Sequence, residues 1–311
     1  MNRRQLLKHS ATLATVVAGS AALSGRHFAV FGAANAAGQR DANDAAAVAN
    51  PLTPPTHGSI QAAFLISEGA VMIDFTGPWE VFQDVSIPGR SDPAFRLYTV
   101  AETAQPIHAS GGMKITPDYT IANAPAPKVI VIPAQRAVSD KVKGWIRNAT
   151  KTTDVTMSVC NGVFVLASTG LLAGKPATAY HGSYVQLQQA YPDIEVKRGV
   201  RFVEAGNLAS SGGLSSGIDL ALRVVERYFG HEAAQETAFS MEYQGQGWMH
   251  PESNAVYASL PVGTPEHPLC PVCGMAADQS IQSVYKGKTY YFCGKDDKRT
   301  FDKSPEQFTK S

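Results

Sequence analysis

The sequence has almost no net charge and few cysteines, and both features exclude classes of protein. Its 27 Lys and Arg residues against 26 Asp and Glu residues give a formal net charge of +1, so there is no overall electrostatic attraction to nucleic acid or to acidic membranes. We therefore expect no nucleic-acid partner. Only four cysteines occur in 311 residues, and a chain of this length can bury one sizeable core without disulfide staples. No internal repeat is visible in the sequence.

The N-terminal region lacks an apolar run long enough to cross a membrane. The run from Ala11 to Leu23 is shorter than the ~20 residues that a spanning helix needs. It follows a basic start with Arg3 and Arg4 and precedes the small residues Ala34-Asn35-Ala36. This pattern resembles a twin-arginine signal peptide over residues 1–36, with an uncleaved amphipathic anchor as the alternative. The resemblance implies a periplasmic product that is not stably inserted in the membrane after processing.

Composition divides the rest of the chain into four segments. Residues 37–58 are rich in Ala, Asn, Asp and Pro and are expected to form a flexible leader. Within 59–243, buried-strand runs alternate with helical segments, which is typical of a parallel sheet covered by helices on both faces. Gly and Pro residues in 244–267 predict an interdomain linker, and 268–311 is a small cysteine-containing module. The predicted fold class is α/β, a doubly wound parallel sheet with an appended module.

Cys160 lies where a buried strand passes directly into a helix. The strand run is Val155 to Val159, and the small residues Ser158 and Gly162 stand two positions before and after the cysteine. Such an elbow forces its central residue into a strained conformation and presents the side chain at the carboxyl edge of the sheet. Because a helix N-terminus lowers the pKa of a thiol, we predict a reactive, low-pKa Cys160. An inert buried cysteine is the alternative.

Three motifs in the chain resemble those of the ThiJ/PfpI family of the class I glutamine amidotransferase-like superfamily. They are Asp-Phe-Thr-Gly-Pro-Trp-Glu-Val-Phe at 74–82, the cysteine elbow and its helix at 158–174, and a Ser-Ser-Gly-Gly turn with a closing helix at 210–222. The most similar branch contains isonitrile-hydratase-like proteins and the ligand domains of AraC-type regulators. The resemblance implies a flavodoxin-like fold with a nucleophile elbow and a small-molecule ligand or substrate, and it is consistent with a homodimer.

Carried over residue by residue, the resemblance makes Cys160 the nucleophile and Asp74 the carboxylate beside it. Such a carboxylate can relay protons or hold the sulfur in its ionised form, whereas an N-cap for the following helix is the simpler interpretation of Asp74. Asn161 stands where many relatives have threonine, and it lacks that hydroxyl group. Ala134-Gln135-Arg136 replaces the Gly-Gly that helps to form the family's oxyanion site. His181 is a candidate base, one position away from the histidine of the family, and an ordinary surface or core histidine is the alternative.

These residues favour a cysteine-dependent hydrolase or lyase that acts on a small molecule, in the manner of the isonitrile-hydratase-like branch. A non-enzymatic protein that senses or handles a small ligand, an oxidant or a metal is the alternative. A cytoplasmic regulator is disfavoured, because the chain has an export signal and lacks the DNA-binding helices that AraC-type relatives append.

The C-terminal module resembles a YHS domain. Cys270 and Cys273 form a C-x-x-C knuckle, and Cys293 directly follows an aromatic strand run that ends at Phe292. Three thiolates make a soft-ligand site for zinc or copper. Asp297, at the place of the family's fourth cysteine, can complete a tetrahedral zinc site, and a three-coordinate site suited to Cu(I) is the alternative. A unit this small has little core, so a bound metal is physically expected. A Cys270–Cys273 disulfide with a free Cys293 is the alternative in an oxidising compartment.

Overall fold

The computed structural model describes residues 48–259 and 263–309. The predicted signal peptide, 1–36, lies outside these residues, as does the start of the predicted leader, 37–47. Among the described residues, no helix combines the length and the apolar character that a membrane span requires. The larger part and the C-terminal module have separate hydrophobic clusters, and each is described by itself.

A seven-stranded sheet forms the centre of the larger part. The strand order is β10-β11-β7-β6-β1-β2-β5, and all neighbours are parallel except the antiparallel pair of β10 and β11 at one edge. The strands are β1 (Ile60–Leu65), β2 (Phe95–Ala101), β5 (Tyr119–Thr120), β6 (Val129–Ile132), β7 (Val155–Val159), β10 (Phe202–Ala205) and β11 (Leu208–Ser211). This arrangement confirms the predicted α/β fold class.

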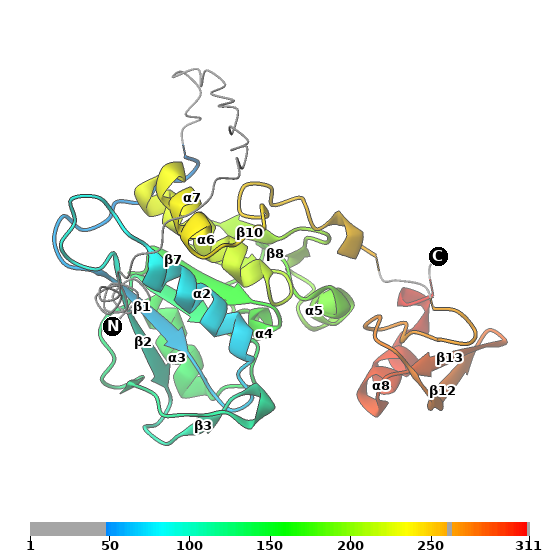
Figure 1. Cartoon of the computed structure of the whole chain (residues 1–311). Helices are drawn as coiled ribbons and strands as arrows, with labels where there is room; N and C mark the ends of the chain where they lie inside the picture. The colour runs from blue at the N-terminus through cyan, green and yellow to red at the C-terminus, as the bar shows by residue number, and fades with distance from the viewer. Residues whose placement is uncertain (1–47, 260–262, 310–311) are drawn as a thin grey trace, which may run out of the picture. The chain divides into compact units, whose positions relative to one another are not determined.

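Within the described residues, six helices cover the sheet, three on each face. The first face carries α2 (Met72–Asp84), α6 (Ser216–Phe229) and α7 (His231–Ser240), and the second carries α3 (Asp140–Ala149), α4 (Gly162–Ala167) and α5 (Tyr184–Ala190). Figure 1 shows α2 and α6 side by side. The minor elements are β3 (Ile107–His108), β4 (Lys114–Ile115), β8 (Pro176–Ala177), β9 (Glu195–Val196), and the 3-10 turns η2 (Ser110–Gly112), η3 (His181–Ser183) and η4 (Ala255–Tyr257).

Alternating strand residues build the core on both faces of the sheet. At the end of β1, Phe64 packs in the cluster under α2, α6 and α7, whereas Leu65 packs in the cluster under α3, α4 and α5. Successive side chains of a strand point to opposite faces, so each central strand contributes to two apolar layers. This explains why the central strands read as continuous apolar runs in the sequence.

The helix boundaries follow local chemistry. The Ser139 hydroxyl accepts a hydrogen bond from the Val142 N–H group at 3.4 Å, which caps α3. Gly230 has a φ of 88°, a conformation that ends α6 and that disfavours residues with a side chain. α2 begins at Met72, three residues before Phe75, where it would begin if Asp74 were its N-cap. Asp74 therefore lies inside the first turn and is not the N-cap of this helix.

The predicted linker, 244–267, begins too early. Trp248 is only 3% exposed, and Asn254 is also buried, so the first part of this segment belongs to the larger domain. A Cβ atom on Gly247 would lie 2.6 Å from Asp219 Oδ2. The glycine is therefore needed for close packing against a buried carboxylate, and its presence does not indicate a flexible connection.

The predicted leader, 37–58, also extends too far. The Leu52 N–H group donates to the Arg227 carbonyl at 2.7 Å, and the Arg227 guanidinium donates to the Asn50 carbonyl at 2.8 Å. These contacts attach the end of the leader to α6, and no local composition signal reports them because the partner lies far along the chain.

The C-terminal module is a hairpin followed by one helix. The strands are antiparallel and are joined at Lys286 and Gly287, both of which have positive φ values of 47° and 76°. Phe301 of the helix packs on Phe292, with ring centroids 5.1 Å apart. The elements are β12 (Asp278–Tyr285), β13 (Lys288–Phe292), α8 (Lys295–Lys303) and the 3-10 turn η5 (Pro305–Gln307).

Candidate functional site

The predicted elbow at Cys160 is present and strained. Cys160 has a φ of 58°, in the left-handed region that costs a non-glycine residue about 1–3 kcal/mol. Its N–H group donates to the carbonyls of Ser211, at 3.2 Å, and Gly212, at 3.0 Å. These bonds hold the conformation from the end of the neighbouring strand, β11. The Cys160 side chain is 6% exposed, so the thiol sits in a nearly closed site.

Gly162 allows the elbow to pass close to the neighbouring strand, β6. A Cβ atom at this position would lie 2.1 Å from the Ile132 carbonyl oxygen, and backbone cannot move aside easily. We expect Gly162→Ala to lower the free energy of unfolding by about 3 kcal/mol or more. Gly144→Ala is the matched control, because its added methyl meets only the tip of Arg147 at 3.9 Å. Equal unfolding midpoints in urea for the two variants would contradict this view of the elbow.

Asp74 lies fully buried in the first turn of α2, beside Cys160. Its Oδ2 atom accepts a hydrogen bond from the Ala134 N–H group at 3.1 Å, while Oδ1 has no partner of good geometry within the described residues. Burial raises the pKa of Asp74 to about 7, and hydrogen bonds from Ala134 and from the Cys160 thiol oppose that rise. The structure therefore brings together the two residues that the family motif pairs.

The predicted low pKa of Cys160 is wrong in direction. Burial, followed by the charge of Asp74, raises the pKa of Cys160 to about 12. Hydrogen bonds from the N–H groups of Leu214 and Asn161 lower the pKa of Cys160, but their effect is smaller than that of burial and of the Asp74 charge. A thiolate and a carboxylate in one buried site repel each other, so the two groups titrate as a pair. Between about pH 7 and about pH 12 the pair holds one proton and one negative charge.

The backbone donors at this site differ from the Gly-Gly arrangement of the family. The N–H group of Ala134 is already used by Asp74, so it cannot also stabilise charge on a substrate. The N–H groups of Leu214 and Asn161 face the Cys160 sulfur and favour its ionised form. Leu214 has a positive φ of 36°, a second strained residue at the site. The Asn161 Oδ1 atom is buried and has no hydrogen-bond partner in the described part of the chain.

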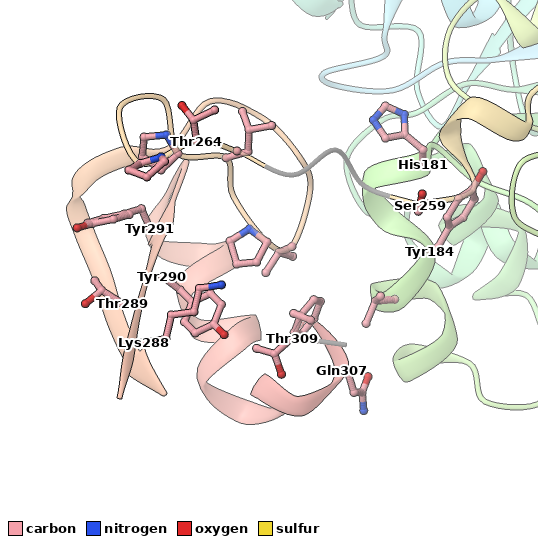
Figure 2. A pocket seen from close by; sticks show the side chains of 18 of the residues that line it. His181, Tyr184, Ser259, Thr264, Lys288, Thr289, Tyr290, Tyr291, Gln307 and Thr309 are labelled. Atoms are coloured by element: carbon pink, nitrogen blue, oxygen red, sulfur yellow. The ribbon is translucent and has the colours of Figure 1, made fainter. Parts of the chain in front are cut away.

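Tyr180, which the sequence analysis does not select, lies near Cys160, whereas no described contact joins His181 to the thiol. A Cβ atom on Gly213 would lie 2.9 Å from the Tyr180 ring, and Tyr180 packs on the core cluster that contains Cys160. The His181 ring instead contacts Tyr180 and Tyr257, with centroids 4.2 and 5.0 Å away, and burial lowers its pKa. Figure 2 labels the side chain of His181, which is the first residue of η3. The sequence held one signal for Tyr180: His181 is one position away from the place of the family histidine, and Tyr180 is its neighbour.

The C-terminal module brings its four predicted ligands together. One ligand atom from each of Cys270, Cys273, Cys293 and Asp297 lies within 4.8 Å of all the others. Asp297 Oδ2 is 3.3 Å from Cys270 Sγ and 3.2 Å from Cys293 Sγ, and Cys273 Sγ is 3.3 Å from Cys293 Sγ. Tetrahedral zinc with thiolates at about 2.3 Å spaces sulfur atoms by roughly 3.8 Å. Because small outward shifts produce that spacing, this donor set fits a soft metal ion.

Local backbone geometry builds this cluster. The Cys270 N–H group donates to the Met275 carbonyl, and the Gly274 N–H group donates to the Cys270 carbonyl, both at 2.8 Å, which closes the knuckle. Cys293 follows the last residue of β13, and Asp297 lies in the first turn of α8. The four cysteines of the chain are free thiols in the structure. A hydrogen bond with its neighbouring thiol lowers the pKa of Cys270 to about 7.

The larger domain is similar in sequence to an isonitrile hydratase among the curated proteins. That enzyme, from Pseudomonas putida, is 30% identical over 190 residues, which cover 60% of this chain and 79% of the relative. The HTH-type transcriptional regulator GbdR of Pseudomonas aeruginosa is 25% identical over 188 residues, or 58% of this chain. The match spans only half of that regulator's length.

Solved structures share the fold of the larger domain. A ThiJ/PfpI family protein from Pseudomonas syringae has a TM-score of 0.54 at 20% identity, over 72% of this chain and 97% of that protein. Drosophila melanogaster DJ-1beta has a TM-score of 0.52 at 21% identity, over 60% and 100% of the two chains. The DJ-1/PfpI family itself matches residues 60–227, and the YHS domain matches 270–311. The chain therefore belongs to the DJ-1/PfpI family and carries a C-terminal YHS domain.

Proposed function

We propose that this chain is an exported enzyme in which Cys160 catalyses the addition of water to a small electrophilic substrate. The observation that carries the proposal is the buried pair of Cys160 and Asp74, which shares one proton above about pH 7. Similarity to an isonitrile hydratase indicates the substrate class, an isonitrile with a small organic substituent. The export part of the proposal rests on Arg3 and Arg4 in the N-terminal sequence.

In the first half of the proposed reaction, the pair supplies a nucleophile and an acid. The reactive form has the proton on Asp74 and the negative charge on the Cys160 sulfur. The sulfur forms a bond to the terminal carbon of the isonitrile, and Asp74 gives its proton to the same carbon. The product of this half is a thioimidate on Cys160, and Asp74 is left as a carboxylate.

In the second half, water completes the addition. The Asp74 carboxylate accepts a proton from the attacking water and passes it to the substrate nitrogen, while the water oxygen bonds to the thioimidate carbon. The carbon–sulfur bond then breaks, the electron pair returns to the Cys160 sulfur, and the hydroxyl proton returns to Asp74. The product is an N-substituted formamide, and the sum is substrate plus one water. The N–H groups of Leu214 and Asn161 face the sulfur and stabilise its negative charge at the start and the end.

The test is turnover of small alkyl isonitriles by the mature protein, with formamide measured by liquid chromatography and mass spectrometry. We expect Cys160→Ser to lower the rate by about 10⁴-fold or more, because a serine in this site lacks an ionisable thiol. Asp140→Asn, which changes an exposed carboxyl group on α3, should leave the rate unchanged. If the wild type converts no isonitrile and forms no covalent adduct at Cys160, the non-enzymatic alternative replaces this proposal.

We further infer that the YHS domain binds one zinc or copper ion through Cys270, Cys273, Cys293 and Asp297. The convergence of three sulfur atoms and one carboxylate oxygen supports this inference. A bound ion would cross-link the knuckle, the end of β13 and the start of α8. Its contribution would be structural, since all four positions of a tetrahedral site are filled by protein ligands.

A further inference from the structure

Arg201 forms a largely buried ion pair that the proposed reaction does not use. It lies one residue before β10 and pairs with Asp219, a fully buried residue of α6. The Arg201 Nε atom donates to Asp219 Oδ2 at 2.6 Å, and Asp219 Oδ1 accepts a hydrogen bond from the Tyr243 hydroxyl at 3.1 Å. A buried carboxylate is costly unless it is paired and hydrogen-bonded, so this pair fixes the position of the guanidinium.

The same arginine bonds both ends of the turn that follows β11, residues 212–215. At the first end, the Gly212 N–H group donates to the Arg201 carbonyl at 2.9 Å. At the other end, Arg201 Nη2 donates to the Ser215 hydroxyl at 3.3 Å. Because the guanidinium is held by α6, these two bonds connect the turn to a rigid helix.

The turn supplies two contacts of the Cys160 site. The Gly212 carbonyl accepts a hydrogen bond from the Cys160 N–H group at 3.0 Å, which helps to hold the left-handed conformation of the cysteine. The Leu214 N–H group faces the sulfur and favours its ionised form. Leu214 has a positive φ of 36°, and such a conformation persists only where the surrounding structure imposes it. The bonds from Arg201 to Gly212 and to Ser215 lie on either side of this strained residue.

Residues beyond the DJ-1/PfpI match, which ends at residue 227, also hold Arg201. Its backbone N–H group donates to the Pro251 carbonyl at 2.6 Å, and its Nη1 atom donates to Asn254 Oδ1 at 3.4 Å. A Cβ atom on Gly247 would lie 2.7 Å from Arg201 Nε, so this segment packs directly on the ion pair. The segment that the sequence suggested as a linker therefore takes part in fixing Arg201.

We propose that Arg201 is a positioning residue for Cys160, which holds the turn 212–215 so that the Leu214 N–H group faces the sulfur. No described contact joins Arg201 to the thiol itself, so it acts through the turn. The inference deepens the proposed function and rests on it for the effect on turnover. The state of the thiol can nevertheless be measured without a substrate.

Loss of this support should reduce the thiolate form of the buried pair. Above about pH 7 the pair of Cys160 and Asp74 holds one negative charge, and the Leu214 N–H group favours its location on the sulfur. When the turn moves away, the charge shifts toward Asp74. The pH at which the charge appears should stay near 7, because burial of Asp74 sets it. Tyr180 also interacts with the charge of Cys160, and its ring is unchanged in the variants below.

The rate of iodoacetamide addition at Cys160 of the mature protein, measured from about pH 5 to about pH 10, tests the proposal. Arg201→Lys keeps a positive charge beside Asp219 but loses the planar fork that also reaches Ser215. We expect its plateau rate above about pH 7 to be roughly tenfold lower than that of the wild type, with the inflection unchanged. Ser215→Ala should lower the plateau by roughly threefold, since it removes one bond to the turn. Ser215 is exposed and its hydroxyl does not cap α6, so this variant should fold.

Arg227→Lys is the matched control. It replaces another guanidinium of the larger domain that pairs with a carboxylate, but the partners of Arg227 are Glu204 and the Asn50 carbonyl, which lie outside the turn. Its alkylation profile should equal that of the wild type. In turnover of an alkyl isonitrile, Arg201→Lys should lower kcat by the same factor and leave KM nearly unchanged. A wild type without turnover would contradict the proposed function alone, because alkylation requires no substrate.

Three results would overturn the inference. The first is a wild-type plateau in Arg201→Lys, which would show that the turn keeps its position without the fork. The second is faster alkylation of Arg201→Lys with an inflection near ~8.5, because the variant would then merely open the domain and expose an ordinary thiol. The third is an equal loss in Arg227→Lys, which would assign the effect to general destabilisation. If Arg201→Lys does not fold, Ser215→Ala decides, and an unchanged plateau in that variant rejects the role of Arg201.

Discussion

Cys293→Ser is expected to remove the metal from the YHS domain and to unfold that domain. The module has a small apolar cluster, in which Val272, Phe292 and Phe301 are the fully buried residues other than cysteine. Burial of so few side chains stabilises a fold only weakly, whereas a thiolate-bound metal contributes about 10 kcal/mol or more to the folding of small domains. Loss of one of the three sulfur ligands should therefore leave the domain without its main source of stability.

The measurements are metal content by mass spectrometry and limited proteolysis of the mature protein. The wild type should carry one ion per chain and resist cleavage after residue 263, and Cys293→Ser should carry none and be cleaved there. Cys160→Ser is the matched control, because it removes a thiol of the larger domain and should keep the ion. Retention of stoichiometric metal by Cys293→Ser, or a Cys270–Cys273 disulfide in protein purified without oxygen, would contradict the metal assignment.

Asp74→Asn is expected to stabilise the larger domain, increasingly so as the pH rises. Burial raises the folded-state pKa of Asp74 from 3.8 to about 7, so the folded state keeps a proton that the unfolded state has lost. Between about pH 4 and about pH 7 the wild type loses stability with rising pH, by a total on the order of 4 kcal/mol. Asparagine has no charge to bury, and its side-chain oxygen can still accept the bond from Ala134.

Urea unfolding of the two proteins at several pH values measures this effect. The difference in the free energy of unfolding should be small below about pH 4 and should reach its plateau above about pH 7, with the variant more stable. Asp140→Asn is the control, since its exposed carboxyl group has no burial penalty to relieve. A variant that is less stable than the wild type at alkaline pH would show that the Asp74 charge is well solvated, contrary to the structure.

The fold was predictable because its signals are local. The apolar run at Val155–Val159 and the small residues around Cys160 specify a buried strand and a tight turn, and both are present. The same holds for the knuckle of the YHS domain, where Cys270 and Cys273 are close in sequence. An element can be predicted from its local sequence pattern when the residues that determine it lie within a few positions of one another.

Contacts between distant residues explain the wrong predictions. The helix N-terminus at Cys160 was visible in the sequence, but the burial of the thiol beside Asp74 was not, and burial decides the direction of the pKa change. Glycine at 247 resembled a linker residue because its close contact with Asp219 comes from another element. Tyr180 was overlooked for the same reason, since its proximity to the elbow arises from the packing of Gly213.

The pH dependence of Cys160 alkylation tests the central claim most directly. The rate of iodoacetamide addition at Cys160, followed by peptide mass spectrometry from about pH 5 to about pH 10, should rise in the wild type with an inflection near pH 7, where the pair acquires its negative charge. Asp74→Asn should lose this inflection, because the thiol then titrates without the carboxyl group. A single inflection near ~8.5 in both proteins would contradict the claim that Cys160 and Asp74 share one proton.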